Sequence, residues 1–71
     1  MEMIDTSRSS CVAAAGYDPN KNQMTIRFKG GREYTFDKVP EHIFLNMINA
    51  SSVGKYFHTN VKNFYSYKRV R

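Results

Sequence analysis

Cysteine, proline and long apolar runs are scarce in this sequence. Its 71 residues include one cysteine, Cys11, two prolines and no tryptophan. A single cysteine cannot form an internal disulfide, so the simplest expectation is a protein of a reducing compartment. The longest apolar run, residues 12–15, is far shorter than the roughly 20 residues of a membrane-spanning helix, and no signal-like apolar segment opens the chain. We therefore expect a cytoplasmic protein without contact to a membrane.

Acidic residues are absent from the last third of the chain. All 6 carboxylates lie in residues 1–50, where an equal number of basic side chains balances them. Residues 51–71 contain the remaining basic side chains and account for the whole net charge of +5. They are Lys55, Lys62, Lys68, Arg69 and Arg71. Clustered cations attract polyanions or acidic protein surfaces, so this segment is the first candidate for a binding site.

Length and aromatic content favour one small globular domain. A chain of 71 residues is too short for two hydrophobic cores. Hydrophobic residues make up 41% of the sequence, which includes five Tyr and five Phe, and this content is higher than that of a disordered tail. Residues 1–10 mix charge with serine and show no period. We expect a flexible lead-in over residues 1–8, a single domain over residues 9–65 and a basic tail over residues 66–71.

Two segments alternate apolar and polar side chains and predict a β-hairpin. They are residues 24–28 and 34–36. A loop over residues 30–32 places Phe28 opposite Tyr34. The same loop places Ile26 opposite Phe36, which keeps one face of the hairpin apolar. A two-residue Gly-Gly loop would instead set apolar residues opposite polar ones, so we expect the three-residue loop.

The polar face of this predicted hairpin pairs opposite charges. In this register Lys29 lies opposite Glu33. Arg27 lies opposite Thr35 and has Glu33 as a diagonal neighbour. Opposite charges on neighbouring strands stabilise a sheet, so we expect Arg27 and Lys29 to have structural roles.

The segment upstream of the hairpin is compatible with two structures. Three successive alanines in residues 11–17 favour a helix, whereas the short length and flanking turn residues favour a strand. The next four residues, Asp-Pro-Asn-Lys, favour a type I turn. Pairing Asp18 with Gln23 across that turn places Ala13 beside Phe28 and continues the apolar face. We therefore expect residues 11–17 to be the first strand of a meander.

Two helical patterns follow the hairpin. Pro40 suits the first position of a helix, and the residues after it place their apolar side chains on one wide arc. Ser51 or Ser52 can cap a second helix that begins near Val53. The predicted fold is α+β: a three-stranded antiparallel β-meander followed by two α-helices packed on one face of the sheet.

The second predicted helix separates an apolar stripe from a basic stripe. The apolar stripe consists of Val53, Phe57, Val61 and Phe64. On the opposite side lie Lys55, His58, Thr59, Lys62 and Asn63. A core-facing stripe opposite a charged one is typical of a helix on the surface of a globular domain. The basic stripe continues into the predicted tail.

Several of these motifs together resemble the KTSC domain. They are Ser9-Ser10 leading into Ala15-Gly16-Tyr17-Asp18, the hairpin Phe28-x-x-Gly31-x-x-Tyr34-x-Phe36, Val39-Pro40, Ala50-Ser51-Ser52-Val53-Gly54-Lys55-Tyr56-Phe57, Val61-Lys62 and Tyr65. The family is named for the C-terminal extension of some lysyl-tRNA synthetases and also occurs as stand-alone small proteins of bacteria and phages. The resemblance covers roughly residues 9–65 and implies a small domain for which RNA binding has been suggested. It does not imply lysyl-tRNA synthetase activity.

One position departs from the pattern of the family that this chain resembles. The central Tyr-x-Tyr of the family is Tyr34-Thr35-Phe36 here, so the second hydroxyl is missing. A role that requires both phenols is not expected, whereas packing by the two rings is retained.

Nucleic-acid binding is the leading hypothesis for function, with RNA favoured. Cations contact phosphates, and exposed aromatic rings stack on unpaired bases. The candidate residues are Lys55, His58, Lys62, Lys68, Arg69, Arg71, Tyr56, Tyr65 and Tyr67. The same charges suit a phage or bacterial module that binds an acidic surface of a host protein. A basic face that only keeps the protein soluble is the third interpretation.

Catalysis and metal binding have little support in the sequence. Cys11 with His42 or His58 could supply a nucleophile and its base, but Cys11 is expected on a strand among alanines, where a thiol usually serves packing. Paired-carboxylate and phosphate-loop motifs are missing, and two His and one Cys lack the spacing of metal ligands. We therefore expect a non-catalytic domain that needs no metal or cofactor.

Overall fold

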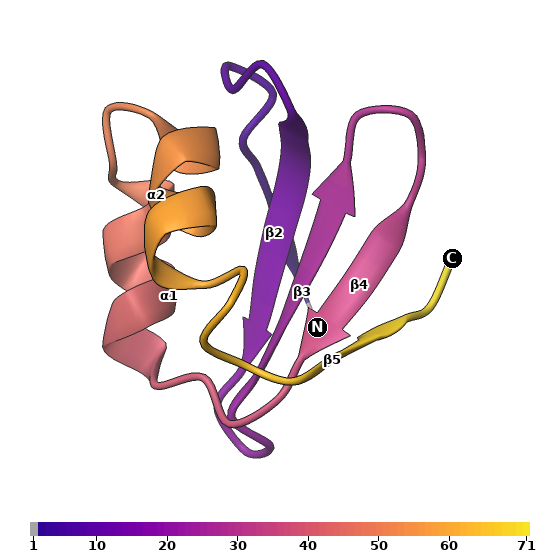
Figure 1. The fold of residues 1–71 in the computed structure, drawn as a ribbon, viewed down its shortest axis with the longest axis vertical. Coiled ribbons are helices and arrows are strands. Elements are labelled where there is room, and N and C mark those ends of the chain that lie inside the picture. The colour runs from indigo at the N-terminus through magenta and orange to yellow at the C-terminus, as the bar shows by residue number, and fades with distance from the viewer. Residues whose placement is uncertain (1) are drawn as a thin grey trace.

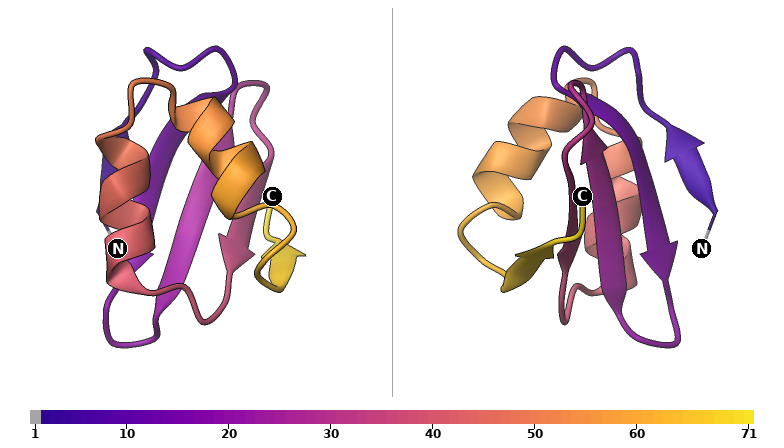
Figure 2. Two further views of the ribbon diagram at one scale, coloured as in Figure 1. Left: turned by 60° about the vertical axis from the view of Figure 1, so that its left-hand side comes forward. Right: turned by 90° about the vertical axis from the view of Figure 1, so that its right-hand side faces the viewer.

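The chain folds into an antiparallel sheet with two helices on one of its faces, as Figure 1 and Figure 2 show. The structure is a computed structural model and describes residues 2–71. The elements are β1 (Met3–Asp5), β2 (Val12–Asp18), β3 (Gln23–Phe28), β4 (Glu33–Phe36), α1 (Glu41–Ile48), α2 (Val53–Asn60) and β5 (Tyr67–Arg69). The strands lie in the sheet in chain order, and every neighbouring pair is antiparallel. An antiparallel sheet with helices on one face is an α+β fold, so the predicted fold class is confirmed.

The sheet has five strands rather than the three predicted. The additional strands, β1 and β5, come from the segments expected to be a lead-in and a tail. In β1, Ile4 lies opposite Ala15 of β2, and in β5, Tyr67 lies opposite Phe36 of β4. Each added strand has three residues and lies at an edge of the sheet, with mostly exposed side chains. Such strands bury too little apolar surface to leave an alternating pattern in the sequence.

The register between β2 and β3 follows the predicted turn and then departs from it. Asp18 pairs with Gln23 as expected. Farther along β2 the register shifts near Ala13, so Phe28 lies opposite Val12. The predicted pairing of Ala13 with Phe28 is therefore wrong, because a β-bulge inserts one extra residue into β2.

The β3–β4 hairpin is displaced by two residues from the predicted register. Ile26 lies opposite Tyr34, and the Phe28 N–H donates to the Arg32 carbonyl at 2.8 Å. The loop therefore consists of Lys29 and the two following glycines, whose φ angles of 105° and 100° suit glycine. A shift of two residues leaves every side chain on its predicted face. The apolar pattern is thus satisfied equally by both registers.

Both basic residues of the hairpin make structural contacts, although with other partners than predicted. Arg27 lies opposite Glu33 rather than Thr35, and its Nε lies 3.0 Å from the Glu33 Oε1. Lys29 does not pair with Glu33; its Nζ donates to the Ser7 carbonyl at 2.8 Å. The two-residue displacement of the hairpin accounts for both changes.

The helices begin close to the predicted positions and cover one core. Ser52 caps α2 by accepting from the Lys55 N–H at 3.2 Å, whereas Pro40 keeps extended backbone and precedes α1. The buried apolar side chains are Val12, Ala15, Met24, Ile26, Phe36, Val39, Phe44, Met47, Val53, Phe57 and Val61. Phe64 was predicted to join them but is 67% exposed. Because α2 ends at Asn60, Phe64 no longer follows the helical stripe.

Tyr17 connects the sheet to the segment before α1. Its hydroxyl donates to the Val39 carbonyl at 2.6 Å, and its ring stacks on Phe44 with centroids 5.5 Å apart. Burial raises the pKa of Tyr17 above its ordinary value of 10.0, and the negative charges of Glu41 and Asp18 act in the same direction.

We expect Tyr17→Phe to lower the free energy of unfolding by about 1 kcal/mol near neutral pH, because the hydrogen bond to Val39 is lost. The raised pKa stabilises the folded state below about pH 10, and this contribution is lost as pH rises through the folded-state pKa of Tyr17. The variant lacks the titrating group, so its deficit in stability should narrow at high pH. Urea unfolding at pH 7 and pH 11 measures both effects, and a constant deficit would contradict this account.

Candidate nucleic-acid interface

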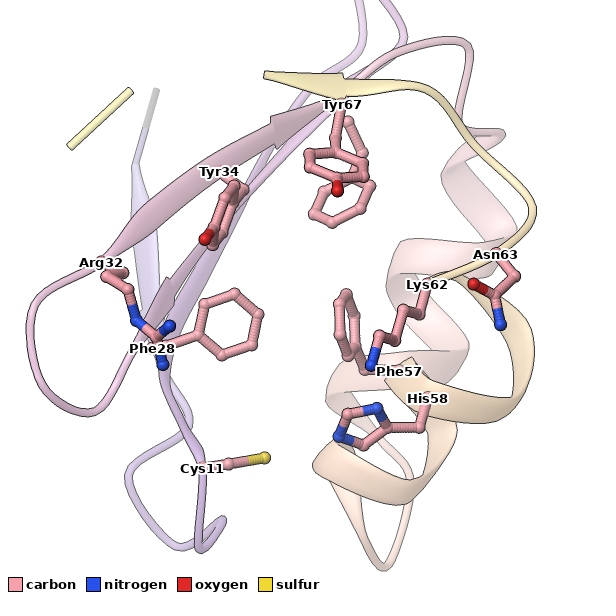
Figure 3. A pocket seen from close by; sticks show the side chains of 10 residues that line it. Cys11, Phe28, Arg32, Tyr34, Phe57, His58, Lys62, Asn63 and Tyr67 are labelled. Carbon is pink, nitrogen blue, oxygen red and sulfur yellow. The ribbon is translucent and has the colours of Figure 1, made fainter. Parts of the chain in front are cut away.

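The predicted basic stripe is exposed along and just beyond α2. Lys55 and His58 lie on the helix, and Lys62 lies in the turn that follows it. The Lys62 N–H donates to the Phe57 carbonyl at 3.0 Å, which ends the helical path. Figure 3 shows the Lys62 side chain beside Phe57 and near His58 as a result.

The basic residues of β5 are divided between the two faces of the sheet. Tyr67 lies opposite Phe36 and therefore faces the helices. Side chains alternate along a strand, so Arg69 shares this face, whereas Lys68, opposite Thr35, lies on the other face. Lys68 and the α2 stripe therefore do not belong to one surface.

Four of the predicted residues, Lys55 of α2 among them, line other hollows or lie at the end of the chain. Lys55 and Tyr56 line a shallow hollow of about 280 Å³ at the start of α2. Tyr65 lines another hollow, of about 370 Å³, which also contains the carboxylate of Asp37. Arg71 is exposed beyond β5. The nine predicted residues thus occupy several surfaces.

A groove between α2 and the strands β3 to β5 brings three of the predicted residues together. It has a volume of about 430 Å³ and contains His58, Lys62 and Tyr67 (Figure 3). Its other lining residues are Cys11, Phe28, Arg32, Tyr34, Phe36, Phe57 and Asn63. Because α2 ends at Asn60, this part of the sheet is left open to solvent.

Five aromatic rings line the groove and contact one another in a closed circuit. In the order Phe28, Tyr34, Tyr67, Phe36 and Phe57, each ring centroid lies 5.4–5.6 Å from the next, and Phe57 returns to Phe28. Phe36 and Phe57 are 3% and 4% exposed and form the floor, whereas Tyr67 is 57% exposed. Most of the contacts are edge-to-face, a favourable geometry for aromatic pairs. We call this arrangement the aromatic circuit.

The charged groups of the groove are basic. Arg32 and Lys62 line it together with the imidazole of His58, and no lining residue carries a carboxylate. Elsewhere, Arg27 is paired with a carboxylate and Arg8 donates to two backbone carbonyls. Within the part of the chain that the structure describes, the Arg32 and Lys62 side chains have no such partner. Their charges are therefore available to a ligand.

The residues considered for catalysis are only partly brought together. Cys11 and His58 both line the groove, whereas His42 lies on α1 and does not. The Cys11 Sγ lies 3.9 Å from the Ser9 Oγ. Among residues 2–71, no three His, Cys, Asp or Glu side chains are grouped so that they could hold a metal ion. Over the same residues, neither helix has the length and apolar character needed to cross a membrane.

Sequence reasoning missed most of the groove. Alternation placed Phe28 and Tyr34 on the apolar face, where they were expected to be covered, and the hairpin loop gave Arg32 no role beyond a turn. Asn63 was placed on the basic stripe but was not proposed as a binding residue. The sequence signal that points to the groove is the alternation that places Phe28, Tyr34 and Phe36 on one face of the β3–β4 hairpin.

Comparison with known proteins finds a matching family model, a relative of similar length and a similar segment within a much longer protein. Residues 8–67 match the family model described as the KTSC domain. The chain is 39% identical over 54 residues to a protein of Tsukamurella paurometabola. The matched segment covers 76% of this chain and 81% of that protein. It is 33% identical over 61 residues to a lysine–tRNA ligase of Nostoc. The matched segment covers 86% of this chain but only 11% of the ligase.

A solved structure has the same fold. A KTSC domain protein from Yersinia pestis matches with a TM-score of 0.90 and 28% sequence identity, covering 99% of this chain and 97% of that one. The motifs, the family model and the fold therefore agree, and this chain belongs to the KTSC domain family.

Proposed function

We propose that this protein is a non-catalytic domain that binds unpaired nucleic acid, with RNA favoured. The ligand would bind at the surface that contains the groove between α2 and the strands β3 to β5. The observation that carries the proposal is that one groove without a carboxylate brings together cations, the exposed ring of Tyr67 and the partly exposed rings of Phe28 and Tyr34. Cations such as Arg32 and Lys62 contact phosphates, and aromatic rings stack on bases that are not already stacked in a duplex. Bases of a double helix could not reach rings that lie within a groove, so the ligand is single-stranded.

One relative supports the choice of RNA. The Nostoc protein that contains a similar segment is named a lysine–tRNA ligase, so its name associates tRNA with a domain of this kind. The matched segment is a small part of that ligase, and the ligase activity is not transferred to this chain. RNA is therefore the first ligand class to test.

Two pairs of cations allow a matched test of the groove. We expect an Arg32→Ala/Lys62→Ala double variant to bind single-stranded RNA about tenfold more weakly at 50 mM salt. Each lost phosphate contact should also make the dependence of log K on log salt shallower by about 0.7, or about 1.4 for both. A Lys55→Ala/Lys68→Ala variant has the same net charge but alters no lining residue of the groove, and it should lose less affinity.

Fluorescence anisotropy with single- and double-stranded RNA and DNA, at 50 and 200 mM salt, measures these differences. Equal losses in the two double variants would contradict a role for the groove. Absence of binding to all four nucleic acids at 50 mM salt would contradict the proposed function itself. The protein-interaction alternative would be favoured by a different result. In that case a protein partner would still be captured from a lysate after nuclease treatment, and acidic residues of that partner would make the contact.

A further inference from the structure

We infer that the groove holds one nucleotide at a time, with its base against the aromatic circuit and its phosphate between Arg32 and Lys62. This inference rests on the proposed function and specifies the unit that the groove recognises. The groove volume of about 430 Å³ lies near the lower end of the roughly 300–1,000 Å³ typical of small-molecule sites. It suits a single nucleotide rather than a stack of several bases.

The arrangement of the rings provides a surface for one planar group. Tyr67 and Tyr34 stand on the sheet side of the groove, and their centroids lie 5.6 Å apart at an interplanar angle of 87°. Two rings at a right angle offer a face and an edge to one base rather than two parallel faces to a stack. The Phe36 and Phe57 rings close the bottom, so the base cannot pass through.

The polar groups lie at the rim, where the rest of a nucleotide would emerge. Figure 3 shows Arg32 on the hairpin side and Lys62 on the helix side, with the rings of Phe28 and Phe57 between them. The amide of Asn63 and the hydroxyl of Tyr34 add hydrogen-bonding groups at the rim. Phosphate and base are thus matched by groups of suitable chemistry at different depths of the groove.

Charge distinguishes a nucleotide from the other ligands that aromatic rings accept. Aromatic cages also bind quaternary ammonium groups through cation–π attraction. Here the rim carries the positive charges of Arg32 and Lys62, and the lining has no carboxylate to offset them, so a cation would be repelled. A neutral apolar ligand would fill the floor but leave the rim charges without a partner. A ligand that combines an aromatic ring with a phosphate satisfies both parts.

The test uses mononucleotides and compares two exposed aromatic residues. AMP and UMP should shift the backbone amide NMR signals of groove residues in the intact protein. Ribose 5-phosphate should bind at least tenfold more weakly than either, and tetramethylammonium should cause no shifts. Tyr67→Ala should weaken AMP binding about tenfold, in line with the loss of one base-stacking contact. Phe64→Ala removes a ring of similar exposure outside the groove and should leave AMP binding unchanged.

The outcomes separate this inference from the proposed function. If single-stranded RNA binds but AMP causes no shifts in the groove, or Tyr67→Ala has no more effect than Phe64→Ala, the inference fails and the function stands. If tetramethylammonium shifts the groove signals, the charge argument is overturned. If Tyr67→Ala unfolds the protein, Arg32→Ala provides a second variant, because Arg32 is exposed beside the hairpin loop; it should also weaken AMP binding.

Discussion

Phe57→Ala should lower the free energy of unfolding by about 3–5 kcal/mol, which is the usual range for removing a buried aromatic ring. Phe57 is 4% exposed, and its ring centroid lies 5.4 Å from that of Phe28 and 5.5 Å from that of Phe36. Both neighbours are held in the sheet and cannot move far to fill the cavity. Since a domain of this size has a total stability on the order of 4–10 kcal/mol, the variant should be close to unfolding at room temperature.

Phe64→Ala is the matched control, because Phe64 follows Phe57 at helical spacing but is 67% exposed. We expect its free energy of unfolding to change by less than about 0.5 kcal/mol. Urea unfolding followed by circular dichroism measures both variants. Equal losses would show that α2 continues beyond Asn60 and buries Phe64, contrary to the structure.

Gly54→Val should destabilise the protein by about 2 kcal/mol, a typical effect of overpacking. The reason is a close approach between α2 and the chain just before β2. A Cβ at position 54 would lie 2.6 Å from the Cys11 Sγ and 3.4 Å from the Ser9 Oγ. The Ser9 Oγ also accepts from the backbone N–H groups of Cys11 and Val12, at 3.3 and 3.2 Å, so this segment cannot easily move away.

A change at Cys11 tests whether the effect is steric. Cys11→Ala removes the sulfur that a Cβ at position 54 would meet. In that background Gly54→Ala should be stabilising by up to about 1 kcal/mol, because alanine is the better helix former. The cost of Gly54→Val should also fall, which appears as a coupling free energy in a double-mutant cycle. A cost that stays the same with and without the sulfur would contradict the contact.

The parts of the fold that the sequence predicts well are those with a strong local signal. The alternation in β3, the Asp-Pro turn and a serine cap before α2 each concern neighbouring residues, and the structure confirms all three, with Ser52 as the cap. The hairpin register was wrong by two residues because both registers keep Ile26 and Tyr34 on the apolar face. The edge strands β1 and β5 were missed because their side chains are mostly exposed.

Three residues of the candidate site, His58, Lys62 and Tyr67, were predicted from the sequence. His58 and Lys62 were found because helical spacing places them on one side of the predicted helix, although Lys62 lies in the turn after α2. Arg32 directly follows the hairpin loop, and its position across the groove from α2 depends on how the sheet and α2 pack together. That packing is a property of the tertiary structure, and local sequence spacing does not encode it.

The pairing of β4 with β5 has a consequence for the order in which the protein folds. Strands β1 to β4 are neighbours both in the chain and in the sheet, whereas β5 joins β4 only after the chain has passed through both helices. Closing that long loop carries a larger entropic cost than forming the short hairpins, so we expect the meander to form first and β5 to dock last. Tyr67 belongs to β5, and a chain whose other elements have already folded therefore acquires a complete groove only in this final step.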